Sequence, residues 1–119
     1  MQGQGAAGSV EDFVALRRTA IECQIRPFGV TDQRILGSFL EIPREKFVPA
    51  GFEPVAYADS ELGHALAGGK GVRPMLMPLV LARMIQAAEV RPGDRVLDVA
   101  GASGYTAAVL AGMAASVVA

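Results

Sequence analysis

Apolar residues recur at helical spacing in three stretches that precede the first strand-like run. The first stretch predicts a helix over residues 10–24, which ends before an Arg-Pro pair. Thr31 is expected to cap a second helix over Asp32–Leu40, whose apolar residues lie on one side. Pro78 suits the first turn of a third helix, which is expected over about 77–89.

The C-terminal part of the chain changes to a pattern of strand, helix and strand. Arg95–Val99 is a short run that predicts a strand, and Tyr105–Ala114 again has helical spacing. Ser116–Ala119 predicts the start of a second strand. This order is typical of a parallel sheet with crossover helices. The expected fold class is therefore α/β, with a helical N-terminal region followed by the start of a parallel sheet.

Between the second and third predicted helices the pattern is irregular. Prolines bracket Ile42–Pro49, which predicts a turn followed by a short extended segment. Glycines and prolines recur through Ala50–Pro74, and a loop of this length in a compact domain often belongs to a binding site. Arg44 and Glu45 are expected to form a structural ion pair or a contact at a helix start.

With 119 residues, 51% of them hydrophobic and 19% charged, the chain suits one modest folded domain. Residues 1–8 are expected to be a disordered lead-in. Residues 9–119 are expected to be the N-terminal part of a single domain, because a parallel sheet needs more strands than are visible here. The net charge of −1 gives no electrostatic case for nucleic acid. Arg17, Arg18 and Arg26 are accordingly expected on a solvated helix face.

The counts of cysteine and histidine limit the chemistry that the chain can perform. Cys23 is the single cysteine, which excludes an internal disulfide and a thiolate metal site, and a buried position is expected for it. The single histidine, His64, is expected at the surface of the long loop. Val99–Ala119 carries no charge, but its alanines and glycines favour a buried strand, turn and helix over a membrane anchor. We therefore expect no metal and no membrane contact.

The most informative stretch is Arg95–Tyr105, in which an acid ends an apolar run, a loop of tiny residues follows and a helix begins. Ligands of open α/β sheets bind at the carboxyl ends of the strands, which places Asp98 at the binding edge. Asp98 is expected either to contact the cationic part of a cofactor or to cap the loop that follows it. A nicotinamide-dependent oxidoreductase also has a small-residue loop here, but the spacing G-x-G-x-x-G is absent.

Several further blocks occur in a characteristic order along the chain. They are Ile25–Leu36 (IRPFGVTDQRIL), Ile42–Pro49 (IPREKFVP), Ala56–Asp59 (AYAD), Pro78–Met84 (PLVLARM) and Val96–Ala111. In this order they resemble the protein-L-isoaspartate O-methyltransferase family over about Ile21–Ala119. The resemblance implies the N-terminal portion of a Rossmann-like fold that binds S-adenosylmethionine, in an enzyme of the cytoplasm.

The resemblance also implies an activity, which is the transfer of a methyl group to the isoaspartyl carboxylate of damaged proteins or peptides, a step in protein repair. Family members are usually about twice this length or somewhat less, so this chain is expected to be inactive alone. The implied partners are isoaspartyl-containing proteins, without nucleic acid or membrane. Self-association through the truncated sheet edge is a further expectation, because an open strand edge invites pairing.

The cofactor residues that the resemblance implies lie in two segments. The family loop reads G-x-G-x-G, and alanine replaces glycine at two of its three positions here. Because an added Cβ at a left-handed position costs about 1–2 kcal/mol, weaker cofactor binding is expected. Tyr105 is expected either near the cofactor or in the core. The implied set comprises Asp98, Ala100, Gly101, Ala102, Gly104, Tyr105, Met75, Leu76 and Met77.

The second departure from the family pattern precedes Pro78. The family commonly has T-I-S-x-P there, with its serine implicated at the active site, and Leu76 stands in that position here. The catalytic residue is therefore unknown, and substrate positioning is affected because leucine cannot donate a hydrogen bond. Core packing is the alternative for Leu76 and its neighbours. Tyr57 and Asp59 match the family's AY-x-D and are expected on the substrate-side loop.

Three hypotheses about function follow from these observations. The first is a short form or fragment of an isoaspartyl methyltransferase with an incomplete cofactor site. The second is a non-catalytic, methyltransferase-like interaction module. The third is a fragment of an NAD-dependent oxidoreductase, which is weaker because a long helical and loop region precedes the strand.

Overall fold

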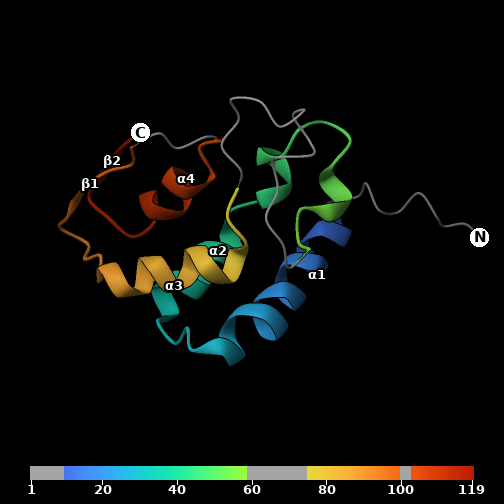
Figure 1. The fold of residues 1–119 in the computed structure, drawn as a ribbon, viewed down its shortest axis with the longest axis horizontal. Coiled ribbons are helices and arrows are strands. Elements are labelled where there is room, and N and C mark those ends of the chain that lie inside the picture. Colours follow the sequence, from blue (N-terminus) through green and yellow to red (C-terminus); the bar gives the residue numbers. More distant parts are fainter. Residues whose placement is uncertain (1–9, 59–74, 100–102) are drawn as a thin grey trace, which may run out of the picture.

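The computed structural model describes residues 10–58, 75–99 and 103–119. Helices fill most of the molecule, and the strand–helix–strand unit lies at one end, at the left in Figure 1. The described elements are α1 (Val10–Ala20), a π-helical turn (Ile21–Ile25), a 3₁₀ turn (Arg26–Phe28), α2 (Gln33–Glu41), the 3₁₀ helices η4 (Arg44–Phe47) and η5 (Glu53–Val55), α3 (Pro78–Ala88), β1 (Arg95–Leu97), α4 (Tyr105–Ala111) and β2 (Ser116–Val118).

The two strands form a parallel pair connected through α4, as expected for the start of a parallel sheet. Val96 pairs with Val117, and Leu97 with Val118. The pairing continues one step further, where the Asp98 amide donates a hydrogen bond to the Val118 carbonyl oxygen at 2.7 Å. Val96 and Val117 pack against the main core, whereas Leu97 and Val118 are exposed. This arrangement confirms the α/β class and its order of elements.

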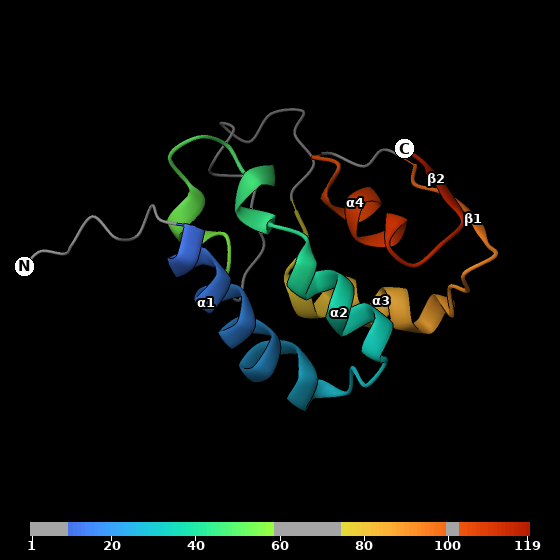
Figure 2. The same cartoon turned by 180° about the vertical axis from the view of Figure 1, so that it is seen from behind.

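The main hydrophobic core lies where α2 packs against α3 and α4. Figure 2 shows α2 lying between α1 and α4. Ile35 of α2 and Val109 of α4 are completely buried. The Ser38 hydroxyl donates a hydrogen bond to the Val109 carbonyl oxygen at 2.6 Å. Gly112 permits this close contact, because a Cβ there would lie 3.1 Å from Ser38 Oγ.

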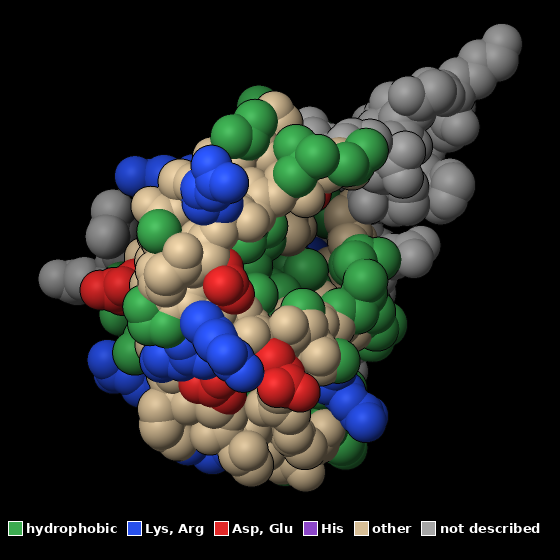
Figure 3. All heavy atoms as spheres, turned by 90° about the vertical axis from the view of Figure 1, so that its left-hand side faces the viewer, with side chains coloured by type: hydrophobic (Ala, Val, Ile, Leu, Met, Phe, Trp, Pro, Cys, Tyr) green, Lys and Arg blue, Asp and Glu red, His purple; other side chains and the backbone are tan. Residues whose placement is uncertain are grey.

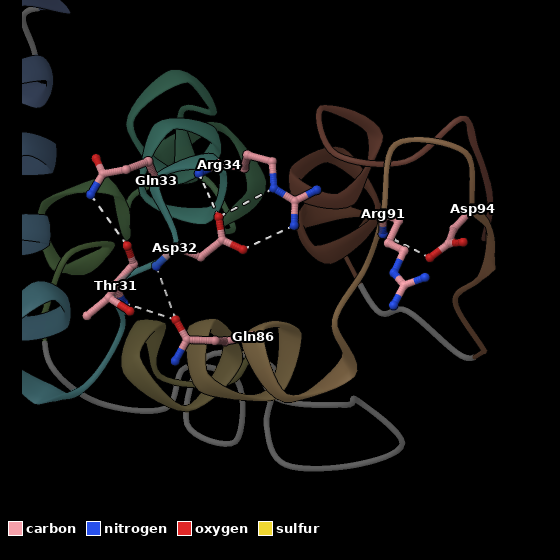
Figure 4. A network of polar contacts seen from close by, with 7 residues as sticks. All are labelled: Thr31, Asp32, Gln33, Arg34, Gln86, Arg91 and Asp94. Carbon is pink, nitrogen blue, oxygen red and sulfur yellow. Dashed lines mark hydrogen bonds and ion pairs between the residues drawn. The ribbon is translucent and has the colours of Figure 1, made fainter.

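Gln86 of α3 holds the turn that leads into α2 (Figure 4). Its Oε1 atom accepts hydrogen bonds from the amides of Thr31 and Asp32, at 3.0 and 3.2 Å, and its Nε2 atom donates to the Gly29 carbonyl oxygen at 2.8 Å. The cap of α2 is Asp32, whose Oδ1 atom accepts from the Arg34 amide at 2.9 Å. The prediction of Thr31 as the cap is therefore wrong, because Asp32 is the extended residue whose side chain reaches the first turn.

The segment around Arg44–Phe47 differs from the expected turn and extended piece, because it is the 3₁₀ helix η4. Pro43 starts this helix, since its carbonyl oxygen accepts a hydrogen bond from the Lys46 amide at 2.9 Å. Proline lacks a donor but keeps its acceptor, so it suits the start of a helix. The expected bounds of the later elements also shorten, since β1 ends at Leu97 and α4 at Ala111.

The first predicted helix consists of α1 and the π-helical turn Ile21–Ile25 that prolongs it. Cys23 is exposed, which corrects the prediction of a buried cysteine. The reason is that the two isoleucines at the ends of this turn occupy the core side. Arg18 and Arg26 are exposed as predicted, and Arg26 pairs with Glu22 at 3.0 Å.

Further sequence predictions concern membranes, metals and residues outside the described ranges. No helix of the described residues is long and apolar enough to cross a membrane. Over residues 10–58, 75–99 and 103–119, no three His, Cys, Asp or Glu side chains are grouped so that they could hold a metal ion. The predicted lead-in at 1–8 and His64 lie outside the described residues.

Candidate functional site

Asp98 follows β1 at the carboxyl end of the parallel pair, where the sequence predicted it. Its backbone amide is fixed by the hydrogen bond to β2. Asp98 is half-buried, and its Oδ2 atom is buried without a hydrogen-bond partner in the described part of the chain. A buried acceptor that lacks a donor is costly, by about 1–3 kcal/mol. A ligand with a hydrogen-bond donor would relieve that cost.

Gly104 ends the loop after β1 and caps α4 with a left-handed backbone, at a φ of 85°. The nearest heavy atom to a Cβ built on Gly104 is Phe47 Cε2, at 4.0 Å, so space is not the constraint. The backbone conformation itself favours glycine, because other residues rarely adopt positive φ. The structure thus gives a physical reason for the glycine that the family loop retains here. Ala100, Gly101 and Ala102 lie outside the described residues.

Tyr105 begins α4 and packs in the core, one of the two alternatives that its position left open. Its ring meets those of Phe39 and Phe47 edge-on, with centroids 6.1 and 5.6 Å away. The Arg44 guanidinium carbon lies 5.0 Å from the centre of the same ring. Burial raises the pKa of Tyr105, so its hydroxyl stays protonated at neutral pH.

The segment Met75–Met77 leads into α3 and is half-buried. Met75 and Leu76 pack against the main core, in line with the packing alternative for these residues. The Leu76 carbonyl oxygen accepts a hydrogen bond from Arg44 Nη2 at 2.9 Å. This segment therefore reaches Arg44, which also contacts the start of α4. One guanidinium thus contacts both implied cofactor segments, through Leu76 and Tyr105.

Tyr57 is buried, and its hydroxyl is the centre of a polar network beneath α1. The hydroxyl donates to Glu45 Oε1 at 2.5 Å and accepts from Arg17 Nε at 2.8 Å and from the Arg44 amide at 3.1 Å. Burial and the bond to Glu45 raise the pKa of Tyr57. The described contacts of this hydroxyl join α1 to η4. Asp59, its predicted companion, lies outside the described residues.

Arg17 is buried, which corrects the prediction of a solvated position. Its Nη2 atom pairs with Glu45 Oε2 at 2.9 Å, and its Nη1 atom donates to the Leu40 carbonyl oxygen at 3.1 Å. Glu45 thus forms its ion pair with Arg17 and not with its neighbour Arg44. The physical reason is that adjacent residues of a helix point in different directions, so they do not face each other.

Arg44 is the residue whose importance the sequence did not indicate. It is 1% exposed, and the described residues offer it no carboxylate. Its Nε atom donates to the Ala56 carbonyl oxygen at 2.7 Å, and its Nη1 atom has no partner among the described residues. Burial lowers the pKa of Arg44. A fully buried arginine is rare unless it is paired. Its burial, which the sequence does not reveal, is therefore the feature that draws attention to Arg44.

The chain matches the sequence profile of the family "Protein-L-isoaspartate(D-aspartate) O-methyltransferase (PCMT)" over residues 17–119. The chain belongs to this family. The match includes Asp98, Gly104, Arg44 and the segment Met75–Met77, so the geometry described above lies within the family's region.

Relatives with this name occur in bacteria and archaea. The chain is 38% identical to the protein-L-isoaspartate O-methyltransferase of Koribacter versatilis over 112 residues, which cover 94% of this chain and 48% of that protein. It is 42% identical to the protein of the same name from Methanoculleus marisnigri over 102 residues, or 86% and 44% of the two chains. The chain therefore spans about half the length of these relatives.

A solved structure supports the same assignment. The fold matches a structure titled protein-L-isoaspartate O-methyltransferase with a TM-score of 0.65 and 29% sequence identity. The match covers 83% of this chain and 29% of that chain. The helical region and the first two parallel strands thus correspond to the N-terminal part of an isoaspartate methyltransferase fold.

Proposed function

We propose that this chain supplies the N-terminal half of the S-adenosylmethionine site of a protein-L-isoaspartate O-methyltransferase. The observation that carries the proposal is the Asp98 carboxylate, which directly follows β1 and has a buried oxygen with no hydrogen-bond donor among the described residues. Gly104 supports the proposal, because its left-handed backbone turns the chain into α4 after the loop that follows β1. Both residues lie in the part of the chain that matches the family.

The residues present fit such a cofactor. S-adenosylmethionine carries a cationic sulfonium, an ammonium group and hydroxyl donors, and it supplies the activated methyl group when bound. Asp98 would hold donors of this molecule, because an ionised carboxylate accepts hydrogen bonds and attracts positive charge. The half-buried Met75–Met77 segment would add apolar surface around the bound molecule. The loop at 100–102 stays a prediction for the same site.

The reaction places modest demands on this part of the protein. An isoaspartyl carboxylate is ionised at neutral pH, because carboxyl groups titrate near pH 4. No strong general base is therefore needed, and the protein mainly has to align the reactants and exclude water. Leu76, at the family's serine position, would supply an apolar wall and no hydrogen bond. We infer that positioning of the isoaspartyl substrate depends on other residues of the complete enzyme.

The activity of residues 1–119 alone is a separate part of the proposal. The matched region makes up less than half of the relatives from Koribacter and Methanoculleus. We infer that cofactor binding by this chain is weak and that methylation of isoaspartyl proteins requires the remaining half. A cytoplasmic location is part of the same expectation.

A second candidate function is an interaction module, and the outer face of the sheet favours it. Leu97 and Val118 are paired neighbours that are 68% and 61% exposed, and Val99 is 76% exposed. Figure 3 looks onto this end of the molecule and shows hydrophobic side chains gathered around a hollow. Exposed strands with apolar side chains favour pairing with another chain. Self-association is the form of this function that the chain can show by itself.

Calorimetric titration with S-adenosylhomocysteine tests the proposal. The test compares the unsubstituted chain with Asp98→Asn, which keeps the shape of the side chain and removes its charge. Glu41→Gln is the matched control, because Glu41 loses the same charge at an exposed position of α2. We expect Asp98→Asn to weaken binding by at least about tenfold, since hydrogen bonds to a charged group contribute about 1.5–3 kcal/mol.

The outcomes separate the candidate functions. A folded chain that binds no S-adenosylhomocysteine, in this form and in a form extended to the length of its relatives, would favour the interaction module. A preference for NAD would contradict both candidates. Equal binding by Asp98→Asn and by Glu41→Gln would remove Asp98 from the site.

A further inference from the structure

The 3₁₀ helix η4 divides its side chains between two different environments. Residues three apart in a 3₁₀ helix lie on the same side, and here these residues are Arg44 and Phe47. Both contact the ring of Tyr105. Glu45, one step along, instead enters the network of Arg17 and Tyr57. One short helix thus contacts the start of α4 with one side and α1 with the other.

The Arg44 side chain contacts three separate segments through two hydrogen bonds and one cation–π contact. Its Nη2 atom holds the Leu76 carbonyl oxygen at 2.9 Å, and its Nε atom holds that of Ala56 at 2.7 Å. Its guanidinium lies 5.0 Å from the ring centre of Tyr105. The planar fork of arginine allows these contacts at once, whereas lysine offers a single compact head. A small cavity of about 10 Å³ borders Arg44, Tyr57 and Tyr105.

The burial of Arg44 is costly, which indicates that its position matters. No carboxylate of the described residues neutralises the guanidinium, and one of its nitrogens has no partner. Cation–π attraction to a desolvated ring offsets only about 2 kcal/mol of such a cost. An apolar side chain would avoid the cost of desolvating a charge. The contacts that an apolar side chain could not make are the hydrogen bonds to the carbonyl oxygens of Ala56 and Leu76.

We propose that Arg44 is a positioning residue for the cofactor pocket, because it fixes the distance between the Met75–Met77 segment and the start of α4. The proposal rests on the proposed function, since both segments belong to the implied cofactor set. Arg44 acts on the pocket through the Leu76 carbonyl and the Tyr105 ring. Its loss would loosen the starts of α3 and α4 and would let the two segments move relative to each other.

The test compares Arg44→Met and Arg44→Lys with Glu45→Gln. The control lies on the same short helix and breaks the ion pair with Arg17, but its hydrogen bonds are with Arg17 and Tyr57, which lie outside both segments. Two measurements are made on each folded protein. The first is the affinity for S-adenosylhomocysteine by calorimetry. The second is hydrogen exchange at the amides of Leu81 and Ala108, which bond to the carbonyl oxygens of Met77 and Gly104 at the starts of α3 and α4.

We expect Arg44→Met to weaken binding and to speed exchange at both amides by about tenfold each, with Arg44→Lys intermediate. We expect Glu45→Gln to change both quantities by less than about twofold relative to the unsubstituted chain, since its hydrogen-bond partners Arg17 and Tyr57 belong to neither of the two segments. Equal effects of Arg44→Met and Glu45→Gln would overturn the proposal. If Arg44→Met does not fold, Arg44→Lys provides the same comparison.

The two measurements also separate this proposal from the proposed function. If the unsubstituted chain binds no S-adenosylhomocysteine, the proposed function fails for this chain, and the exchange measurement decides the role of Arg44. Faster exchange at Leu81 and Ala108 in Arg44→Met would then support the positioning of the two segments. Unchanged exchange would contradict it.

Discussion

Gly104→Ala provides a sharp test of how the chain enters α4. The backbone at Gly104 is left-handed, with φ at 85°, and a Cβ there would meet nothing closer than Phe47 Cε2 at 4.0 Å. The expected cost is therefore the backbone strain alone, about 1–2 kcal/mol. A loss of that size lowers the ratio of folded to unfolded chain roughly 5- to 30-fold.

Gly37→Ala is the matched control, because it makes the same substitution without the strain. Gly37 lies inside α2, and a Cβ there has open space around it. Alanine is expected to stabilise this helix by about 0.5–1 kcal/mol. Urea denaturation of both variants measures the two free energies of unfolding. Equal shifts for the two substitutions, or no loss for Gly104→Ala, would refute the assignment of a strained turn before α4.

Two further predictions concern the cap of α2 and the open sheet. Asp32→Ala should lower the free energy of unfolding by about 1 kcal/mol at neutral pH, and Asp32→Asn by less. The Arg34 side chain donates a hydrogen bond to Asp32 and lowers its pKa. The stabilisation that depends on this charge is therefore complete above the usual carboxyl pKa near 4, and it disappears as the pH falls through the lower pKa of the folded state. Denaturation of both variants at two pH values checks this. A free energy of unfolding of Asp32→Asn that stays below that of the unsubstituted chain in acid would contradict it. For the sheet, we expect the chain to associate with increasing concentration in sedimentation velocity. Leu97→Lys should abolish this association, and Met84→Lys, at a comparably exposed site on α3, should leave it intact. Association that both variants retain would exclude the sheet face.

The parallel unit could be predicted from the sequence because its signals are local. The apolar run before Asp98, the small-residue loop and the helical spacing after Tyr105 together specify strand, turn and helix. Asp98 itself could be placed at the carboxyl end of the strand for the same reason. The family blocks added the prediction that the chain forms the N-terminal part of a methyltransferase fold, and the match to a solved structure confirms it.

The role of Arg44 could not be predicted because its partners are distant carbonyl oxygens. Every residue carries a carbonyl group, so the sequence contains no complementary side chain that would reveal the contacts with Ala56 and Leu76. Arg17 was misplaced for a related reason. Its partners Glu45 and Tyr57 lie 28 and 40 residues away, and nothing on its own helix indicates them.

The central claim is that the carboxyl end of β1 and the start of α4 form a site for S-adenosylmethionine. Titration of the ¹⁵N-labelled chain with S-adenosylhomocysteine, followed by NMR, tests this claim most directly at a mass of 12.4 kDa. We expect the amide shifts of Asp98, Gly104 and Tyr105 to change together, while those of Thr31 and Asp32 stay constant. A well-dispersed spectrum in which these three amides do not respond, or in which the changes gather elsewhere, would contradict it.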